Sequence, residues 1–524
     1  MIREKKTLFS ILIIYALSIN FIFSQQKNYQ QGQLQKFSKV YQLINGIYVD
    51  SVDNHKLIEV ALESMLKELD PHSGYMTAEE TKAANELLQG NFEGIGIQYQ
   101  LVEDTITVIS PITGGPSEKV GIMAGDKIIE IDGKPATGKK ITTTWVQKQL
   151  KGPKDTEVKV KIFRLAEKEF LDFTIVRDVI PMHSIDVWYM VDSEIGYLKL
   201  NRFARTSAAE FEEAVADLKE KGMKKLILDL RNNPGGFLDV AIKLCDEFLP
   251  KDKLIVYTEG RVYPRKDALA TEEGIWEKGD VAVLINEGSA SASEILSGAI
   301  QDWDRGAVIG RRSFGKGLVQ SQYSLQDSSQ VRITVARYYT PSGRCIQKPY
   351  DKGSDDYFKD LEKRLQHGEL MNKDSIQFPD SLIYKTESGR IVYGGGGIMP
   401  DIFVPIDTTL YSEFYKKIIT KGIANSFSYR YVEKNRKKLN KKYPTEEKFI
   451  NNFYLSDLEI DEVTELCRAS GIEIDNFNLD KSSILVETQL KALIGRSLFN
   501  IGTYYKVINA IEPEFNKAIE YFTN

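Results

Sequence analysis

The chain has 524 residues, of which 42% are hydrophobic and 27% charged, so it is long enough for about three soluble domains. Its 69 lysines and arginines against 74 acidic residues give a net charge of -5, which argues against the basic excess typical of nucleic-acid binding. The four histidines and three cysteines lack the spacing of zinc sites and disulfide frameworks, so no metal site is expected.

The N-terminus has the pattern of an export signal. Three basic residues within the first six precede an apolar stretch over 8–23, and a polar segment begins at Gln25. This order predicts a secretory signal over 1–24. An uncleaved membrane anchor is the alternative, because the apolar run approaches the length that spans a bilayer. We therefore expect an exported, periplasmic protein, in contact with the membrane only if this segment is retained as an inner-membrane anchor.

The next two segments differ in pattern. Residues 25–91 are expected to form a helical N-terminal segment, broken by a turn cluster over 70–74, because their apolar residues recur at helical spacing. From 92 to 179 the pattern changes to short strands with one helix over 142–150. We interpret this part as a separate, strand-rich domain.

Strands and helices alternate between 180 and 406. The expected strands include 195–200, 226–230, 281–285 and 307–309, and the expected helices are 208–220, 237–249 and 292–302. Such alternation predicts an α/β core with a largely parallel sheet. After it, helical patterns continue to the C-terminus, so 407–524 is predicted to be a helical domain.

A serine-rich stretch over 286–294 lies between a predicted buried strand and a predicted helix. A serine at this turn would project beside the free N–H groups of the first helical turn, which suit a developing oxyanion. Taken alone, the stretch is better explained by helix capping, with Glu294 as the acidic partner. It does not match the Gly-x-Ser-x-Gly turn of α/β-hydrolases.

A second stretch, over 313–320, supplies a candidate base. Lys316 stands between two glycines, and burial against apolar neighbours would lower its pKa so that the neutral amine can accept a proton. Gln320 can orient that amine by a hydrogen bond. The stretch also approaches a phosphate-binding loop, but Gly317 stands where serine or threonine is required and a strand is expected to follow.

A third stretch, over 229–236, ends in two glycines at another strand-to-helix turn. Their N–H groups can meet a substrate oxygen together with the N–H of Ala292. Alternatively, the glycines serve only the backbone conformation of the turn.

Together these stretches resemble the carboxyl-terminal processing peptidases, also called tail-specific proteases. The matching motifs follow the family's order at 69–73, 94–96, 125–129, 229–236, 288–294, 314–320 and 397–401. The resemblance implies a multidomain α+β / α/β fold, with a PDZ domain over 92–179 and an α/β protease core of the ClpP/crotonase type over 180–406. The insert 351–382 and the tail after 406 lie outside the resemblance, and their candidate roles are oligomerisation or adaptor binding.

The resemblance also implies the site residues and the absence of any metal or cofactor. Ser291 corresponds to the nucleophile, Lys316 to the general base, and Gln320 to the residue that positions the lysine. The other implied residues donate backbone N–H groups: Gly235, Gly236 and Ala292 to an oxyanion hole, and Gly94, Ile95, Gly96 and Ile97 to the carboxylate of a PDZ-bound peptide.

The implied function is that of a serine endopeptidase that cleaves exported proteins near their C-termini. Its partners would be protein substrates, whose tails the PDZ domain recruits as added β-strands. The alternatives are a non-catalytic PDZ scaffold that binds peptides and a histidine-based serine hydrolase that uses His72. A glycosidase with the acid pair Asp302 and Asp304 is less favoured, because both acids are expected to be solvated at a helix end.

Overall fold

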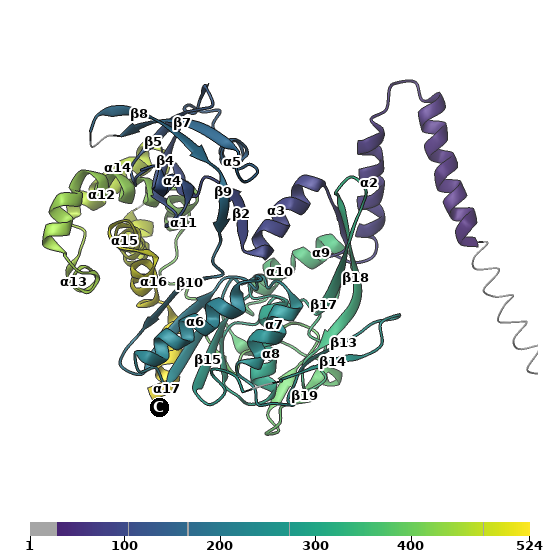
Figure 1. The fold of residues 1–524 in the computed structure, drawn as a ribbon. Coiled ribbons are helices and arrows are strands. Elements are labelled where there is room, and N and C mark those ends of the chain that lie inside the picture. The colour runs from purple at the N-terminus through teal and green to yellow at the C-terminus, as the bar shows by residue number, and fades with distance from the viewer. Residues whose placement is uncertain (1–28, 103, 165–166, 272, 475, 524) are drawn as a thin grey trace, which may run out of the picture. The chain divides into compact units, whose positions relative to one another are not determined.

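The computed structural model of the chain describes residues 29–102, 104–164, 167–271, 273–474 and 476–523 (Figure 1). The predicted export signal over 1–24 lies outside these ranges. The chain divides into two compact units, residues 1–75 and 76–524. Within the described ranges, no helix is both long enough and apolar enough to cross a membrane.

The described part of the first unit is mainly helical. A helix covers 29–47, and α2 follows over Asn54–Lys67. After α2, the buried carboxylate of Asp70 accepts the N–H groups of His72 and Ser73 at 2.8 and 2.9 Å. Asp70 therefore makes the backbone hydrogen bonds that hold the predicted turn cluster together.

The second unit begins with helix α3, Ala78–Gln89, which Thr77 and Glu80 cap at its N-terminus. A strand-rich domain follows, with a sheet of strand order β3-β4-β5-β7-β8 and the short β6 paired to β5. Its strands are β3 (Ile97–Val102), β4 (Thr105–Pro111), β5 (Lys127–Ile131), β6 (Lys134–Pro135), β7 (Glu157–Arg164) and β8 (Glu169–Val176). Helices α4 (Pro116–Lys119) and α5 (Thr143–Leu150) complete it.

Two short strands lie at the start and the end of this domain. β2 (Asn91–Gly94) and β9 (Asp178–Pro181) pair antiparallel, so both connections of the domain to the rest of the unit run side by side. The alternation of β7 explains the fold of the domain, because Val158, Val160 and Ile162 point into its apolar core while the lysines between them do not.

The predicted α/β core is built on a six-stranded sheet of order β10-β11-β12-β15-β16-β21. β10 is antiparallel to β11 and the other neighbours are parallel. The strands are β10 (Ile185–Met190), β11 (Ile195–Leu200), β12 (Lys225–Asp229), β15 (Asp280–Ile285), β16 (Ala307–Gly310) and β21 (Ile402–Phe403).

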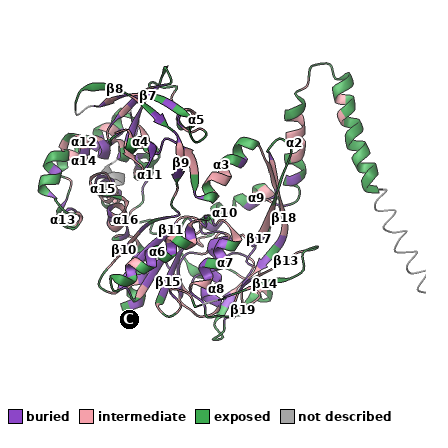
Figure 2. Ribbon diagram, in the orientation of Figure 1, coloured by how far each residue is buried: buried purple, intermediate pink, exposed green. Residues whose placement is uncertain are grey.

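Alternate residues of these strands point to opposite faces of the sheet. Leu226 and Leu228 pack with helices α6 (Ser207–Glu220), α7 (Leu238–Asp246) and α8 (Ala292–Asp302). Ile227 points to the other face, where it packs with residues of the last helix, α17 (Pro513–Thr523). Helices therefore cover both faces, and α8 is buried along its whole length (Figure 2).

A second sheet of the core contains three antiparallel strand pairings, which the sequence patterns predicted only in part. β17 (Leu318–Ser324) pairs with β18 (Gln330–Tyr339), and β13 (Leu254–Glu259) pairs with β18 and with β14 (Lys266–Leu269). The insert over 351–382 is mainly helical. It forms α9 (Ser354–Phe358), α10 (Asp360–Gln366) and two 3-10 turns, Lys373–Ser375 and Asp380–Leu382. A hairpin of β19 (Ile383–Lys385) and β20 (Ile391–Tyr393) follows.

The C-terminal region is helical. It comprises α11 (Glu413–Thr420), α12 (Ile423–Lys442), α13 (Glu446–Asn452), α14 (Asp457–Ala469), α15 (Asn476–Leu498), α16 (Ile501–Asn509) and α17. Residues of α11, α12, α14 and α15 share one apolar cluster, and residues of α12, α13 and α15 share another. α17 instead packs on the sheet of the protease core.

Candidate active site

The serine-rich stretch forms a tight turn between β15 and α8. Ser291 immediately precedes α8 and has φ 55° and ψ -111°. A residue other than glycine held at positive φ costs about 1–3 kcal/mol, so its surroundings must enforce the conformation. They do so through its neighbours: Ser289 Oγ donates to the Leu230 carbonyl at 2.8 Å, and Ser293 Oγ donates to the Asn233 carbonyl at 2.9 Å.

These contacts distinguish the three serines. Ser289 and Ser293 are fully buried and anchor the turn to the 229–236 loop. Ser291 between them lines a cavity of about 440 Å³. The side chain available for chemistry is therefore that of Ser291.

The same cavity brings all three sequence-predicted stretches together. Its lining includes every residue for which the sequence reading expected a catalytic or oxyanion role: Gly235, Gly236, Ser291, Ala292, Lys316 and Gln320. Apolar residues also line the cavity, among them Leu88, Phe237 and Ile295. The lining therefore combines polar groups with apolar side chains, as ligand-binding cavities commonly do.

Glu294 connects the turn of Ser291 to the loop of Lys316. Its Oε2 accepts the N–H of Ser291 at 2.8 Å and the N–H of Lys316 at 2.9 Å, and its Oε1 accepts the N–H of Gly315 at 2.7 Å. Burial raises the pKa of this carboxyl, while these hydrogen bonds act in the opposite direction. The expected capping bond to Ser291 is present, whereas no local pattern predicts the bonds to Gly315 and Lys316.

Tyr338 makes a second connection between the same two residues. It lies on β18 with 1% of its surface exposed, and its hydroxyl contacts the carbonyl oxygens of Ser291 at 3.1 Å and Lys316 at 2.5 Å. Tyr338 was not among the predicted site residues, because it reaches the carbonyls of Ser291 and Lys316 only through the tertiary fold.

The two glycines of the 229–236 loop have different N–H environments. The N–H of Gly235 donates to Asn233 Oδ1 at 2.9 Å. Within the described ranges, the N–H groups of Gly236 and Ala292 have no protein acceptor. A Cβ at 235 would lie 2.8 Å from the Ala292 nitrogen, and a Cβ at 236 would lie 2.1 Å from the Phe203 carbonyl oxygen, so both positions require glycine.

The insert over 351–382 contacts the loop that carries Lys316. Arg364 of α10 is 3% exposed and donates to the carbonyl of Ser313 at 2.8 Å. Burial lowers the pKa of Arg364 to about 10, with repulsion from Arg312 as a further cause. The ammonium of Lys348 lies 4.0 Å from the ring centre of Phe314, in cation–π contact. The segment over 351–382 therefore supports the loop that carries Lys316.

Gln320 lies on β17, opposite Thr334 of β18. Its Nε2 contacts Thr334 Oγ1 at 3.4 Å, and its side chain lines the cavity together with Lys316. This position on a paired strand restricts where the amide can point.

The predicted peptide loop of the strand-rich domain borders a second cavity, of about 360 Å³. Ile95, Gly96 and Ile97 line it, whereas Gly94 belongs to β2 and is not part of the lining. Most of the remaining lining residues come from α3, α5 and β2: Ala83, Glu86, Leu87, Phe92, Gln147, Leu150 and Lys151. Lys151 and Glu86 form an ion pair of 2.6 Å at this cavity.

The acid pair considered for a glycosidase is not solvated as expected. Asp302, the last residue of α8, is buried and paired with the fully buried Arg344 at 2.7 Å. Asp304 pairs with Arg390 at 2.6 Å. The expectation of solvated acids was wrong because two arginines from distant segments meet them, and both acids are engaged in ion pairs.

Comparisons with known families follow the same division of the chain. The family described as Peptidase family S41 matches residues 194–353, and the PDZ domain family matches 94–175. The N-terminal domain of the activating protease CtpB matches 19–81, and a family of unknown function matches 414–500. These matches confirm the predicted PDZ domain and protease core between helical segments.

Individual relatives are also similar over the central part of the chain. A carboxy-terminal-processing protease of Bartonella bacilliformis is 40% identical over 343 residues, which cover 64% of this chain and 77% of the relative. A probable CtpA-like serine protease of Staphylococcus aureus is 36% identical over 342 residues, covering 64% and 67%. Among solved structures, a photosystem II D1 C-terminal processing protease is 24% identical, covers 70% of this chain and 92% of its own, and has a TM-score of 0.35.

Proposed function

Because the chain belongs to the carboxy-terminal-processing protease family of serine-type peptidases, we propose that Ser291 is its nucleophile and Lys316 its general base. The observation that carries the proposal is that one cavity is lined by Ser291, Lys316, Gln320 and the two unpaired N–H donors. The shared contacts of Glu294 and Tyr338 with both residues support it further.

The proposed reaction is acyl transfer through the serine. The neutral amine of Lys316 takes the proton of Ser291 Oγ as that oxygen attacks the scissile carbonyl. The N–H groups of Ala292 and Gly236 then stabilise the oxyanion, and Gly236 is favoured over Gly235 because Asn233 occupies the Gly235 N–H. Lys316 returns the proton to the leaving amine, and water hydrolyses the acyl-enzyme. Gln320 orients the lysine.

We further propose that the second cavity binds the C-terminal tail of a protein substrate. The N–H groups of the 95–97 loop would receive the terminal carboxylate, and the apolar side chains of Phe92, Leu87 and Leu150 would receive an apolar last residue. The N-terminal sequence supports an exported, periplasmic protein, and exported proteins would then be its substrates.

The test is cleavage of a reporter protein that carries an apolar C-terminal tail. Ser291→Ala and Lys316→Ala should each abolish cleavage, since each removes one partner of the proton transfer. The matched controls Ser324→Ala and Lys352→Ala change exposed residues outside the cavity and should cleave as the wild type does. A wild-type protein that binds the tail but never cleaves it would instead favour the peptide-binding scaffold.

A further inference from the structure

The C-terminal helix brings carboxylates to the loops that carry the proposed catalytic groups. Glu514, in the first turn of α17, is 3% exposed and pairs with both Arg231 and Arg311. Arg231 follows the end of β12 and Arg311 follows the end of β16. Each arginine precedes a proposed catalytic group by five positions: Gly236 in one loop and Lys316 in the other.

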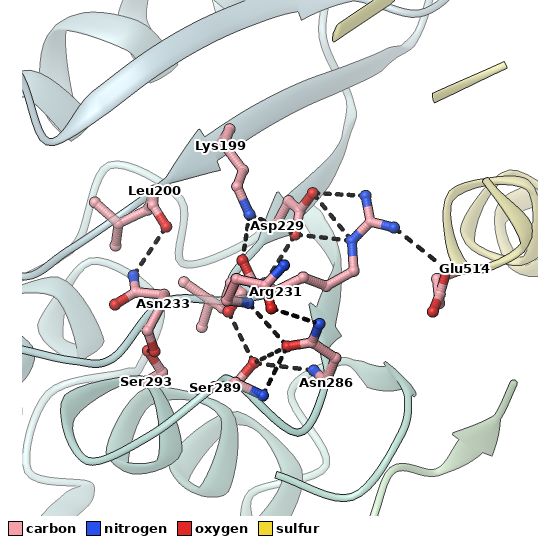
Figure 3. A network of polar contacts seen from close by, with 12 residues as sticks. Lys199, Leu200, Asp229, Arg231, Asn233, Asn286, Ser289, Ser293 and Glu514 are labelled. Carbon is pink, nitrogen blue, oxygen red and sulfur yellow. Dashed lines mark hydrogen bonds and ion pairs between the residues drawn. The ribbon is translucent and has the colours of Figure 1, made fainter. Parts of the chain in front are cut away.

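Arg231 is the centre of a buried polar network (Figure 3). Its guanidinium pairs with Asp229 at 2.8 Å and with Glu512 at 2.7 Å, and its contact with Glu514 is 3.3 Å. Lys199 donates to Asp229 at 3.1 Å and to the backbone carbonyl of Arg231 at 2.5 Å. Both the side chain and the backbone of Arg231 are therefore fixed.

The network continues from Arg231 to the turn of the nucleophile. The N–H of Asn232 donates to Asn286 Oδ1 at 2.8 Å, and Asn286 Nδ2 donates back to Asn232 Oδ1 at 3.0 Å. One position further, the carbonyl of Asn233 accepts from the N–H of Ala290 at 3.0 Å and from Ser293 Oγ at 2.9 Å. A shift of Arg231 would thus be transmitted to residues on both sides of Ser291.

The charges of the network depend on α17. The buried or nearly buried cations of the network are Lys199, Arg231 and Arg311. The core that carries these cations supplies two anions, Asp229 and Glu287. The third and fourth anions, Glu512 and Glu514, come from the C-terminal region. Without them, the core would hold three cations against two anions, and a buried charge without a partner is strongly unfavourable.

We propose that Glu514 is a positioning residue of the active site, which holds the 231–236 and 311–316 loops in their catalytic arrangement through Arg231 and Arg311. This inference rests on the proposed roles of Gly236 and Lys316. It assigns a task to the C-terminal helix, which lies beyond both the S41 match at 194–353 and the match of unknown function at 414–500. Glu514 touches no substrate in this account and acts only through the two arginines.

The test compares Glu514→Gln with Glu520→Gln. The control lies on the same helix, but Glu520 is half exposed and forms an ion pair with Lys517 at 2.7 Å. Glu514→Gln should lower kcat for the tailed reporter by between about tenfold and a hundredfold, as expected for misplaced catalytic groups, with KM within about twofold. Glu514→Asp keeps the charge and should recover most of kcat, and Glu520→Gln should match the wild type.

Hydrogen exchange measured by mass spectrometry gives a readout that does not require activity. In Glu514→Gln, amides of both 231–236 and 311–316 should exchange faster than in the wild type. In Glu512→Gln only 231–236 should do so, because Glu512 forms an ion pair with Arg231, whereas the C-terminal carboxylate that pairs with Arg311 is that of Glu514. If Glu514→Gln does not fold, Glu512→Gln still tests whether a C-terminal carboxylate holds the 231–236 loop through Arg231.

Unchanged exchange at 231–236 in both variants would overturn the inference, as would kcat values equal to those of Glu520→Gln. If the wild type and Ser291→Ala cleaved equally, the proposed catalytic roles would fail instead. The exchange comparison would still decide whether Glu514 holds the two loops.

Discussion

Glu294 Oε2 accepts the backbone N–H of Lys316 at 2.9 Å, although the two residues are 22 positions apart in the chain. The same oxygen accepts the N–H of Ser291 at 2.8 Å. One buried carboxylate oxygen therefore fixes the main chain of the proposed nucleophile relative to that of the proposed base. A glutamate that the sequence pattern assigns to a helix cap can in this way align two loops with proposed catalytic residues.

Replacing Glu294 by glutamine should impair both catalysis and stability. A glutamine has one carbonyl oxygen for the N–H groups that two oxygens now accept, and its amide nitrogen would face donors. We expect kcat to fall by about a hundredfold or more, because the two loops lose their alignment. Urea unfolding should show a loss of about 1–3 kcal/mol for the unsatisfied buried groups. Glu220→Gln, at the exposed end of α6, is the control and should change neither quantity.

Replacing Tyr338 by phenylalanine removes only the hydroxyl that contacts the carbonyls of Ser291 and Lys316. Because the ring stays in place, the fold should survive with a loss of about 1–2 kcal/mol. Steady-state kinetics should show kcat reduced by about tenfold and KM nearly unchanged, since the contact orients catalytic residues and does not bind substrate. A change in KM alone would mean that Tyr338 belongs to the substrate-binding wall.

Asp229 should make stability depend on pH in the acidic range. Burial alone would raise its pKa, but the charges of Arg231 and Lys199 and the hydrogen bonds of Arg231 outweigh burial and hold the pKa well below its usual range. The unfolded chain takes up a proton on this residue near pH 4, whereas the folded chain does so only at lower pH. The stabilisation is therefore fully present above about pH 4 and is lost as the pH falls further.

Unfolding by urea at several pH values checks this expectation. The difference in unfolding free energy between the wild type and Asp229→Asn should narrow as the pH is lowered from 5 toward 2. A difference that stays constant over this range would show that the ionised form of Asp229 contributes nothing to stability.

Arg364→Ala tests whether the 351–382 segment supports the lysine loop. The change leaves the Ser313 carbonyl without its buried donor, so we expect a loss of about 1–3 kcal/mol in stability and a lower kcat. Lys363→Ala on the same helix removes a partly exposed ion pair with Asp356 and should cost less than about 1 kcal/mol. Equal effects of the two changes, measured by urea unfolding and reporter cleavage, would rule out the supporting role.

Amidation of a peptide's C-terminus tests the proposed tail site. A peptide with an apolar last residue and a free carboxylate should bind, and its amidated form should bind about tenfold or more weakly, because it loses charge-assisted bonds to the 95–97 loop. Fluorescence polarisation with the Ser291→Ala protein measures this without cleavage. Equal affinities would mean that the cavity recognises side chains alone.

Much of the fold follows from local sequence patterns. The strand at 195–200 and the helix at 292–302 have the predicted bounds, because the strand is largely apolar and the helix places Ile295, Leu296, Ala299 and Ile300 at helical spacing. The hairpin of β17 and β18 was only partly predicted, since half-exposed strands with mixed polar residues leave no such pattern. The sequence therefore did not predict that Gln320 and Tyr338 lie on paired strands of one hairpin.

The candidate site divides in the same way. The residues proposed for chemistry lie in motifs that resemble a known peptidase family when they are taken together, and this resemblance is what identified them. The residues that align them, such as Tyr338, Arg364 and Glu514, come from segments far away in sequence and carry no local signal. Only the tertiary structure brings their polar atoms to the catalytic loops.

The most direct test of the proposed mechanism is to trap the acyl-enzyme during turnover. The reaction with the tailed reporter is quenched in acid at early times, and the tryptic peptide over 279–305, which contains Ser289, Ser291 and Ser293, is examined by mass spectrometry. We expect the N-terminal fragment of the substrate to be esterified to Ser291, and no adduct to form in Ser291→Ala or Lys316→Ala. An adduct on Ser289 or Ser293, or an undiminished adduct in Lys316→Ala, would contradict the proposed mechanism.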